Sequence, residues 1–371
     1  MSDPRWKNLA DVLIDYSIKL RNEEVVVIFA MDAPDEMVAL LIKKIYDVGG
    51  IPLLVSSNER VLRAYIKDTN EATMRIYGEV ELSMCKRAKA AIFLIGSSNL
   101  TELSDVPDEK MNLYVKYRQG PVVFDWIVNN LKWVLLNWPY TSLAQAAEMS
   151  TEAFEDFFFE SCTMDYSKMS LAMDPLVKLM QRTDQVRLVS PGTDLEFSIK
   201  GIPAIKCDGA MNLPDGEVFT APVKDSINGT IRYNTRTSYQ GKVYDNIAFR
   251  FKDGRIVEST SSRTEEMNAV LDTDEGARYI GEFAIGLNPF VTKPMLNILF
   301  DEKIAGSIHL TPGNAYDMAP NGNKSLIHWD LVLIQTKKWG GGEIYFDGEL
   351  VRKDGVFVIE ELIGLNPEHL R

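Results

Sequence analysis

The sequence is poor in cysteine, in histidine and in positive charge. Its three cysteines, Cys85, Cys162 and Cys207, lie far apart, which excludes a disulfide framework and a cysteine-rich zinc site. The chain has 40 Lys and Arg against 53 Asp and Glu, for a formal net charge of −13. Because non-specific binding to nucleic acid depends on Lys and Arg that neutralise phosphates, we expect no nucleic-acid partner.

Long hydrophobic runs are also missing. No segment approaches the length of a membrane-spanning helix, and the opening MSDPRWKNLADVLIDYSIKL lacks the basic and then apolar regions of a signal peptide. The acidic balance also disfavours binding to anionic lipid. We therefore expect a cytoplasmic protein with no membrane partner.

In the first half, short apolar runs alternate with amphipathic helical segments. The runs are 24–30, 51–57, 90–98 and 132–139, and they have the β-branched character of strands buried on both faces of a parallel sheet. This βαβ pattern predicts an open α/β domain. The turn after the first run, AMDAPDEM, is not a glycine-rich phosphate loop, so we expect no nucleotide site there.

The second half consists mainly of strand and turn patterns. After a helical stretch from 140 to about 185, segments such as 186–201, 243–259 and 341–358 combine apolar alternation with turn residues that include Asp-Gly. They predict a mainly antiparallel, β-rich domain. Since 371 residues exceed what one core usually supports, we expect two domains, 1–187 and 188–371.

One predicted strand, SLIHWDLVLIQ at 325–335, carries two polar groups that are costly to bury. Side chains alternate along a strand, so His328 and Asp330 should point to the same face. The simplest interpretation is a His–Asp hydrogen bond at a sheet edge. The alternative is a shared metal ion that compensates for their burial.

Three further stretches of this half place acids or imidazole in strand-like surroundings. The only other histidines are His309 and His369, and the latter is expected to be solvated in the tail NPEHLR. Imidazole combined with carboxylates and no thiolate suits zinc, cobalt or manganese, typically in catalytic sites. The β-rich half offers enough such groups for two ions, although no local signature such as HExxH unites them. From chemistry alone, a dinuclear hydrolase and a purely structural role both stay open. The candidates are Glu217 in LPDGEVFTAP, Glu282 in RYIGEFAIGLNP, Glu302 and His309 in FDEKIAGSIHLTPGNAY, and His328 with Asp330.

These stretches resemble a known enzyme family. MNLPDGEVFTAPVKDSINGTI, the Gly-Glu of RYIGEFAIGLNP, the His-x3-Gly-x2-Tyr of HLTPGNAY and SLIHWD are similar, in this order, to motifs of the metallo-aminopeptidases that include aminopeptidase T, AmpS and PepS. Stretches of the first half, such as LADVLIDYSIKLRNEEVVVIFA and WVLLNWPYTSLAQAAEMS, are similar too. The resemblance therefore covers nearly the whole chain.

The resemblance implies a metal site and a catalytic tyrosine. The tyrosine falls on Tyr316, seven residues after the first histidine ligand. The Glu of the Asp-Glu pair stands seven residues before that histidine, where the commoner family spacing is five. The implied cofactors are two divalent metal ions, with zinc first and cobalt or manganese as alternatives. The implied ligands are Glu217, Glu282, Glu302, His309, His328 and Asp330.

The function implied is that of a cytoplasmic, homodimeric aminopeptidase that acts on short peptides. A metal-activated water would attack the scissile carbonyl, Tyr316 would hydrogen-bond the oxyanion, and Glu217 or Glu282 could carry the proton to the leaving amine. Two alternatives share the same ligands. One is a dinuclear amidohydrolase that acts on non-peptide amides, and the other is a non-catalytic metal-binding protein.

Overall fold

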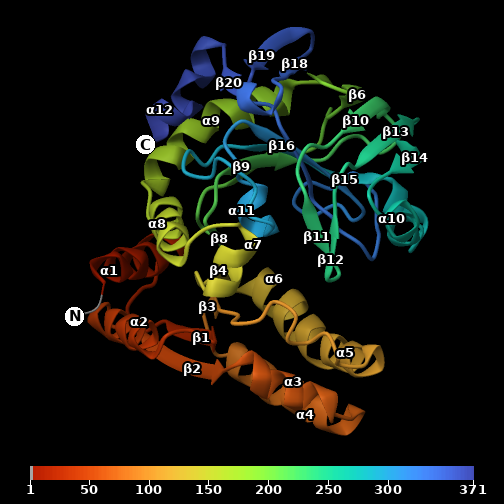
Figure 1. The fold of residues 1–371 in the computed structure, drawn as a ribbon. Helices are drawn as coiled ribbons and strands as arrows, with labels where there is room; N and C mark the ends of the chain where they lie inside the picture. The colour runs from red at the N-terminus through yellow and green to blue at the C-terminus, as the bar shows by residue number, and fades with distance from the viewer. Residues whose placement is uncertain (1–2) are drawn as a thin grey trace. The chain divides into compact units, whose positions relative to one another are not determined.

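The computed structural model describes residues 3–371, which form two compact units (Figure 1). One unit comprises Met1–Thr163 with Gly209–Leu213, and the other comprises Met164–Asp208 with Pro214–Arg371. The division of the sequence into domains 1–187 and 188–371 stays a prediction. No helix within the described range is long and apolar enough to span a membrane.

The first unit is built on a five-stranded parallel sheet. Its strands are β1 (Val25–Met31), β2 (Ile51–Ser57), β3 (Ala90–Ile95), β4 (Lys132–Asn137) and β8 (Asn212–Leu213), in the order β2-β1-β3-β4-β8. All of their pairings are parallel. Each of the four apolar runs in the first half therefore forms a strand, and the predicted open α/β architecture is confirmed.

Helices connect these strands, and their ends follow local signals in the sequence. The Asn58 and Asn70 side chains cap α3 and α4 by accepting backbone N–H groups. The wide helical segment η2 contains Gly120 and Pro121, and Pro121 has no N–H to donate to the helical hydrogen bonds. The helices are α1 (Pro4–Asp11), η1 (Val12–Ser17), α2 (Asp35–Asp47), α3 (Glu59–Lys67), α4 (Glu71–Cys85), α5 (Asp108–Tyr114), η2 (Val115–Ile127), α6 (Val128–Asn130), α7 (Thr141–Ala146) and α8 (Thr151–Cys162).

An ion pair between the buried Glu81 and the partly buried Arg118 ties α4 to η2, and its loss should destabilise the first unit. Arg118 donates Nε to Glu81 Oε2 at 2.6 Å and Nη2 to Oε1 at 3.0 Å. Arg118→Met would leave the Glu81 carboxylate buried without its cation, so we expect the free energy of unfolding, measured by urea titration, to fall by about 3–5 kcal/mol. Arg75→Met removes the exposed i,i+4 pair with Glu71, and it should leave the free energy of unfolding unchanged within error. Equal stabilities for the two variants would contradict the role given to Arg118.

The second unit contains two antiparallel sheets and a small hairpin, as the β-rich pattern predicts. The larger sheet has the order β14-β13-β10-β6-β5-β18-β19-β20, and the smaller has the order β17-β16-β15-β9-β7. The strands of the larger sheet are β5 (Gln185–Ser190), β6 (Thr193–Ser198), β10 (Asn228–Arg232), β13 (Ala248–Lys252), β14 (Arg255–Thr260), β18 (Glu343–Phe346), β19 (Glu349–Lys353) and β20 (Val356–Phe357). Those of the smaller sheet are β7 (Ile205–Cys207), β9 (Glu217–Thr220), β15 (Ile280–Gly286), β16 (Ser307–Pro312) and β17 (Leu331–Ile334), and the hairpin pairs β11 (Thr237–Tyr239) with β12 (Lys242–Tyr244). The helices are α9 (Tyr166–Arg182), α10 (Thr264–Leu271), η3 (Glu275–Arg278), α11 (Ile298–Asp301), η4 (Lys337–Trp339), η5 (Glu360–Leu365) and α12 (Pro367–Leu370).

The smaller sheet has one face against the larger sheet and another that carries polar groups. On the first face, the rings of Phe197 in β6 and Phe283 in β15 meet edge to face, 5.0 Å apart. On the second, the register places Glu217 opposite Gly286 and His309 opposite Ala284, so that these side chains share a face with Glu282. The fold thus gathers acids and imidazole from three adjacent strands.

The strand predicted over 325–335 is shorter than expected. β17 covers only Leu331–Ile334, and His328 makes an isolated bridge with Gly313. Gly313 has a φ of +112°, and a Cβ there would lie 2.1 Å from the Ile327 carbonyl oxygen. The Asp274 carboxylate accepts the Leu326 N–H at 2.6 Å. Before Leu331 the chain pairs with the end of β16 only at this isolated bridge, so the predicted first half of the strand was wrong.

Candidate metal centre

The six residues proposed as ligands come together in the second unit. Glu217, Glu302 and His309 place one ligand atom each within 4.8 Å of one another, and Glu282, His328 and Asp330 do the same. Five of them come from β9, β15, β16 and the segment that leads into β17, and Glu302 directly follows α11. The seven-residue separation between Glu302 and His309 therefore does not keep this glutamate away from the cluster.

Gly286 permits this approach of Glu302. A Cβ at Gly286 would lie 2.4 Å from the Ile304 carbonyl oxygen and 3.0 Å from that of Glu302. The segment after α11 therefore passes close to β15, and it then turns at Gly306, which has a φ of +81°. Only a residue without a side chain fits at position 286.

Glu282 belongs to the second of these groups but contacts the histidines of both. Its Oε1 is 3.1 Å from His309 Nε2, and its Oε2 is 3.3 Å from His328 Nε2. The side chain is almost completely buried. A carboxylate with one oxygen toward each histidine has the arrangement needed to be shared by two cations.

His328 and Asp330 do point the same way, although they precede the strand. His328 Nε2 is 3.4 Å from Asp330 Oδ1, and His328 Nδ1 donates to the Asn314 carbonyl at 2.9 Å. In neutral imidazole this leaves a lone pair on Nε2, which faces two carboxylate oxygens. A lone pair that faces carboxylate oxygens is repelled by them, so this arrangement is favourable only if a proton or another cation lies between Nε2 and the oxygens. A hydrogen bond to the other ring nitrogen is also the usual support of a metal-bound histidine.

Two buried polar atoms at the site have no hydrogen-bond partner within residues 3–371. They are Glu217 Oε2 and His309 Nδ1. Glu217 Oε2 is 3.6 Å from His309 Nε2, beyond normal hydrogen-bond distance. Leaving a buried carboxylate oxygen unsatisfied is costly. A divalent cation bound by this oxygen would remove that cost, so the donor set fits a metal.

The pKa values of the cluster residues also indicate that positive charge is stabilised within the cluster. Burial raises the pKa of Glu302 to about 8. Burial alone would lower the pKa of His309, but the Glu217 and Glu282 carboxylates raise it to about 9. For Asp330 the burial effect is outweighed by His328, which holds the carboxyl pKa well below its ordinary value. Without another cation, the acids therefore keep protons on the imidazoles.

Tyr316 stands at the rim of the cluster. Its ring centroid is 4.5 Å from that of His328 and 5.8 Å from that of Phe219, and 46% of the residue is exposed. Partial burial, together with the nearby Glu282 and Asp330 carboxylates, raises the pKa of its hydroxyl well above the ordinary value. The hydroxyl thus stays protonated at neutral pH and can donate a hydrogen bond.

Comparison with models of known protein families identifies the family of this chain. Residues 2–357 match the family model described as thermophilic metalloprotease (M29). The chain belongs to this M29 family. The match covers both units and all the candidate site residues, so the resemblance inferred from the sequence motifs is confirmed.

Several aminopeptidases are similar to this M29 chain. Aminopeptidase T of Thermus thermophilus is 25% identical over 92% of the chain and 95% of its own length. Aminopeptidase 2 of Geobacillus stearothermophilus is 37% identical, over 39% of the chain and 37% of its own length. AmpS of Bacillus subtilis is 36% identical over 33% of the chain and 30% of its own length. The last two alignments thus span about a third of those relatives.

The fold is that of a solved structure described as wild-type AmpT from Thermus thermophilus. The TM-score is 0.80 at 22% identity, over 96% of this chain and 99% of the other. This likeness supports the assignment of both the parallel sheet of the first unit and the antiparallel sheets of the second.

Sequence reasoning missed two charged residues of the candidate site, Lys303 and Asp215. Lys303 Nζ lies 3.2 Å from Asp215 Oδ1, 2.7 Å from Glu217 Oε1 and 2.9 Å from Glu302 Oε1. A signal was present, because Lys303 stands between Glu302 and the apolar start of a buried strand, where a lysine needs partners. Asp215 lies two residues before Glu217, in a Pro-Asp-Gly turn that is common on exposed surfaces.

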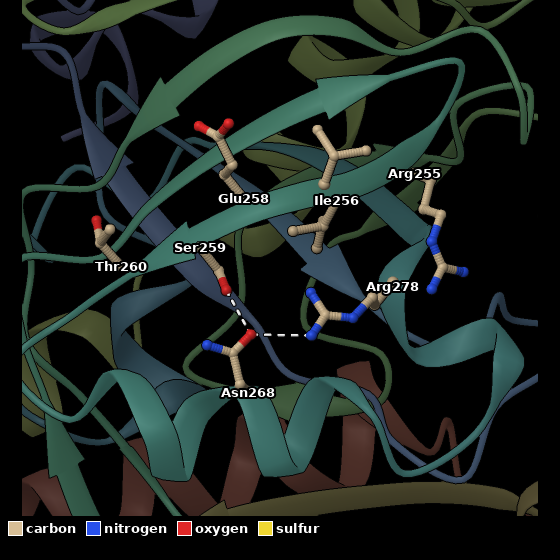
Figure 2. Close-up of a pocket in the computed structure, with 8 residues that line it drawn as sticks. Arg255, Ile256, Glu258, Ser259, Thr260, Asn268 and Arg278 are labelled. Carbon is tan, nitrogen blue, oxygen red and sulfur yellow. Dashed lines mark hydrogen bonds between the residues drawn. The ribbon is translucent and has the colours of Figure 1, made fainter.

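The open groove between β14 and α10 is not this site. It has a volume of about 690 Å³ and is lined by residues from 255 to 278. Three of its polar side chains bond to one another: Asn268 Oδ1 accepts from Ser259 Oγ at 2.7 Å and from Arg278 Nη2 at 2.9 Å (Figure 2). Its one acid, Glu258, pairs with Arg250. None of the candidate ligands lines it.

Proposed function

We propose that this M29 protein is a metal-dependent aminopeptidase that hydrolyses the N-terminal peptide bond of short peptides at a site for two divalent ions. The observation that carries the proposal is the position of Glu282, with one carboxylate oxygen toward each of two histidines. The six proposed ligands form two groups of three, and Glu282 belongs to one group while it also contacts the histidine of the other. One zinc ion usually takes four ligands, so six exceed what a single ion needs.

The residues divide into two ligand sets. Glu217 and Glu302 would serve with His309, Asp330 would serve with His328, and Glu282 would belong to both. When bound, the ions supply Lewis-acid polarisation of the scissile carbonyl and lower the pKa of the attacking water. Zinc is the first candidate, and cobalt or manganese are alternatives, because imidazole and carboxylate oxygen suit all three.

Tyr316 is proposed as a catalytic residue that does not bind metal. Its hydroxyl keeps its proton at neutral pH, and the residue lies beside His328 at the more exposed end of the cluster. A phenol there can donate a hydrogen bond to the oxygen of the tetrahedral intermediate, where negative charge develops. The contact of its ring with Phe219 limits how far the ring can turn.

The proposed substrate class rests on the relatives. Proteins named aminopeptidase T, AmpS and PepS are similar to the chain, which favours an exopeptidase over an amidohydrolase that acts on non-peptide amides. The preference for short peptides, the homodimer and the cytoplasmic location stay predictions. Static light scattering at micromolar concentration tests the homodimer, for which the expected mass is twice that of the 41.9 kDa chain.

The function is tested with a panel of N-terminally varied dipeptides beside matched non-peptide amides and N-acetylated dipeptides. The protein is assayed as purified, after chelation, and after the return of zinc, cobalt or manganese. We expect hydrolysis of free dipeptides only, its loss on chelation and its recovery with metal. Hydrolysis of acetylated peptides would refute an aminopeptidase, and preferred cleavage of non-peptide amides would favour the amidohydrolase. Metal binding without hydrolysis of any substrate would indicate the non-catalytic alternative.

A further inference from the structure

Lys303 is a buried cation within the acidic cluster that the proposed reaction does not use. Its side chain is 1% exposed, and Nζ contacts the carboxylates of Asp215, Glu217 and Glu302. A lysine is rarely buried to this degree unless it is paired. Three carboxylate oxygens within 3.2 Å of Nζ give the ammonium charge-assisted partners that compensate for its burial.

The backbone around Lys303 is fixed, so the ammonium has a defined place. The Lys303 carbonyl accepts the Asn288 N–H at 2.9 Å, and the Lys303 N–H donates to the Phe300 carbonyl at 3.0 Å. Asn288 Nδ2 donates to the Asp215 carbonyl at 2.7 Å. The loop that carries Asp215 and the segment that carries Lys303 are therefore both anchored to the residue two positions beyond β15.

The contacts of Lys303 divide the oxygens of Glu217 into two kinds. Oε1 lies 2.7 Å from Lys303 Nζ, whereas Oε2 is buried without a hydrogen-bond partner among the described residues and is 3.6 Å from His309 Nε2. Glu302 likewise uses its Oε1 for the ammonium, at 2.9 Å. Each carboxylate is thus held by one oxygen, and its rotation is restricted.

We propose that Lys303 is a positioning residue that holds Glu217 and Glu302 by one oxygen each, so that the other oxygen of each is directed toward the metal site. The ammonium also offsets the negative charge of Asp215, whose Oδ1 lies 3.2 Å from Nζ.

The inference rests on the proposed metal site, and the test uses Lys303→Met, which keeps the length of the side chain and removes its charge. With Co²⁺ as the probe, we expect close to two equivalents still to bind, because all six proposed ligands remain. The visible spectrum of bound Co²⁺ should change, since it reports ligand geometry. Turnover of a dipeptide should fall about 10–100-fold, as is typical when a partner of a metal ligand is removed. The metal-free variant should also melt at a lower temperature than the metal-free parent, because Asp215 and Glu217 lose their buried cation.

Lys353→Met is the matched control, because its Nζ pairs with Glu343 at 2.9 Å on the larger sheet. It should leave the cobalt spectrum and turnover unchanged. A Lys303→Met protein with a lower melting temperature but the parent's cobalt spectrum and turnover would mean that Lys303 only supports the fold, which overturns the proposal.

A second variant covers the case in which Lys303→Met does not fold. Lys303→Arg keeps the charge. The N–H groups of a guanidinium lie in one plane, however, so they cannot point from a single nitrogen to three carboxylates as those of an ammonium do. We expect an altered cobalt spectrum and at least a severalfold loss of turnover, and a variant indistinguishable from the parent overturns the proposal. If the parent binds two Co²⁺ ions but cleaves no peptide, the aminopeptidase proposal fails. The cobalt spectra then still decide the role of Lys303.

Discussion

Glu282→Gln is expected to abolish hydrolysis and to reduce the bound metal from about two ions per chain to fewer than one. Glutamine has nearly the same shape, but it carries no charge and replaces one oxygen with an NH₂ group that has no lone pair to offer. Because the two oxygens of Glu282 face His309 and His328, the substitution affects both ligand sets at once. Metal analysis of protein purified without chelators and a dipeptide assay measure the two effects.

The matched control for this variant is Glu258→Gln on β14. Glu258 is an exposed acid of the same unit that pairs with Arg250 and lies outside the cluster. The Glu258→Gln variant should keep the metal content and the rate of dipeptide hydrolysis of the parent. If Glu282→Gln also kept full metal content and activity, Glu282 would not be a shared ligand, and its contacts with the histidines would be structural hydrogen bonds.

Tyr316→Phe is expected to reduce turnover by about 10²–10³, or roughly 3–4 kcal/mol of transition-state stabilisation. The variant removes one hydroxyl and keeps the ring, so the packing against His328 and Phe219 and all proposed ligands remain. Metal content should not change. KM should change little, because an interaction formed mainly in the transition state lowers kcat more than it raises KM.

Tyr345→Phe is the control, because the Tyr345 hydroxyl donates to Glu343 on the larger sheet. The turnover of the Tyr345→Phe variant should be close to that of the parent. A Tyr316→Phe rate within a few-fold of the parent would reject the catalytic assignment. A large loss accompanied by missing metal would mean instead that Tyr316 supports the geometry of the ligands.

The parallel sheet could be predicted because its signal is local. Runs such as 24–30 and 90–98 are apolar and β-branched, and the strands Val25–Met31 and Ala90–Ile95 lie within two or three residues of the predicted ends. Strand ends depend on turns and caps, which the apolar pattern does not encode. The order of the strands follows from packing between distant segments, so the sequence predicted the sheet type but not the order β2-β1-β3-β4-β8.

At the site, too, local geometry could be predicted from the sequence and contacts between distant segments could not. The rule that residues two apart on an extended chain share a side placed His328 and Asp330 together correctly, even though β17 begins only at Leu331. The contact holds because the chain before β17 is still extended near the bridge to Gly313. The proximity of Glu302 to His309 could not be derived from spacing, because it depends on the close passage of the segment after α11 over Gly286.

Lys303 illustrates what motifs leave out. It is not an acid or imidazole, so a search for metal ligands passes over it, and its three partners come from positions 215, 217 and 302. Only the folded chain shows that the acidic cluster already contains one positive charge.

The central claim is a site at which two divalent ions bind and are required for peptide hydrolysis. It is tested most directly by titrating metal-free protein with Zn²⁺ or Co²⁺ while bound metal and dipeptide hydrolysis are measured on the same samples. We expect no activity without metal, a plateau near two bound ions per chain, and activity that continues to rise through the second equivalent. Full activity in the metal-free protein, or a plateau at one ion with full activity, would contradict the claim.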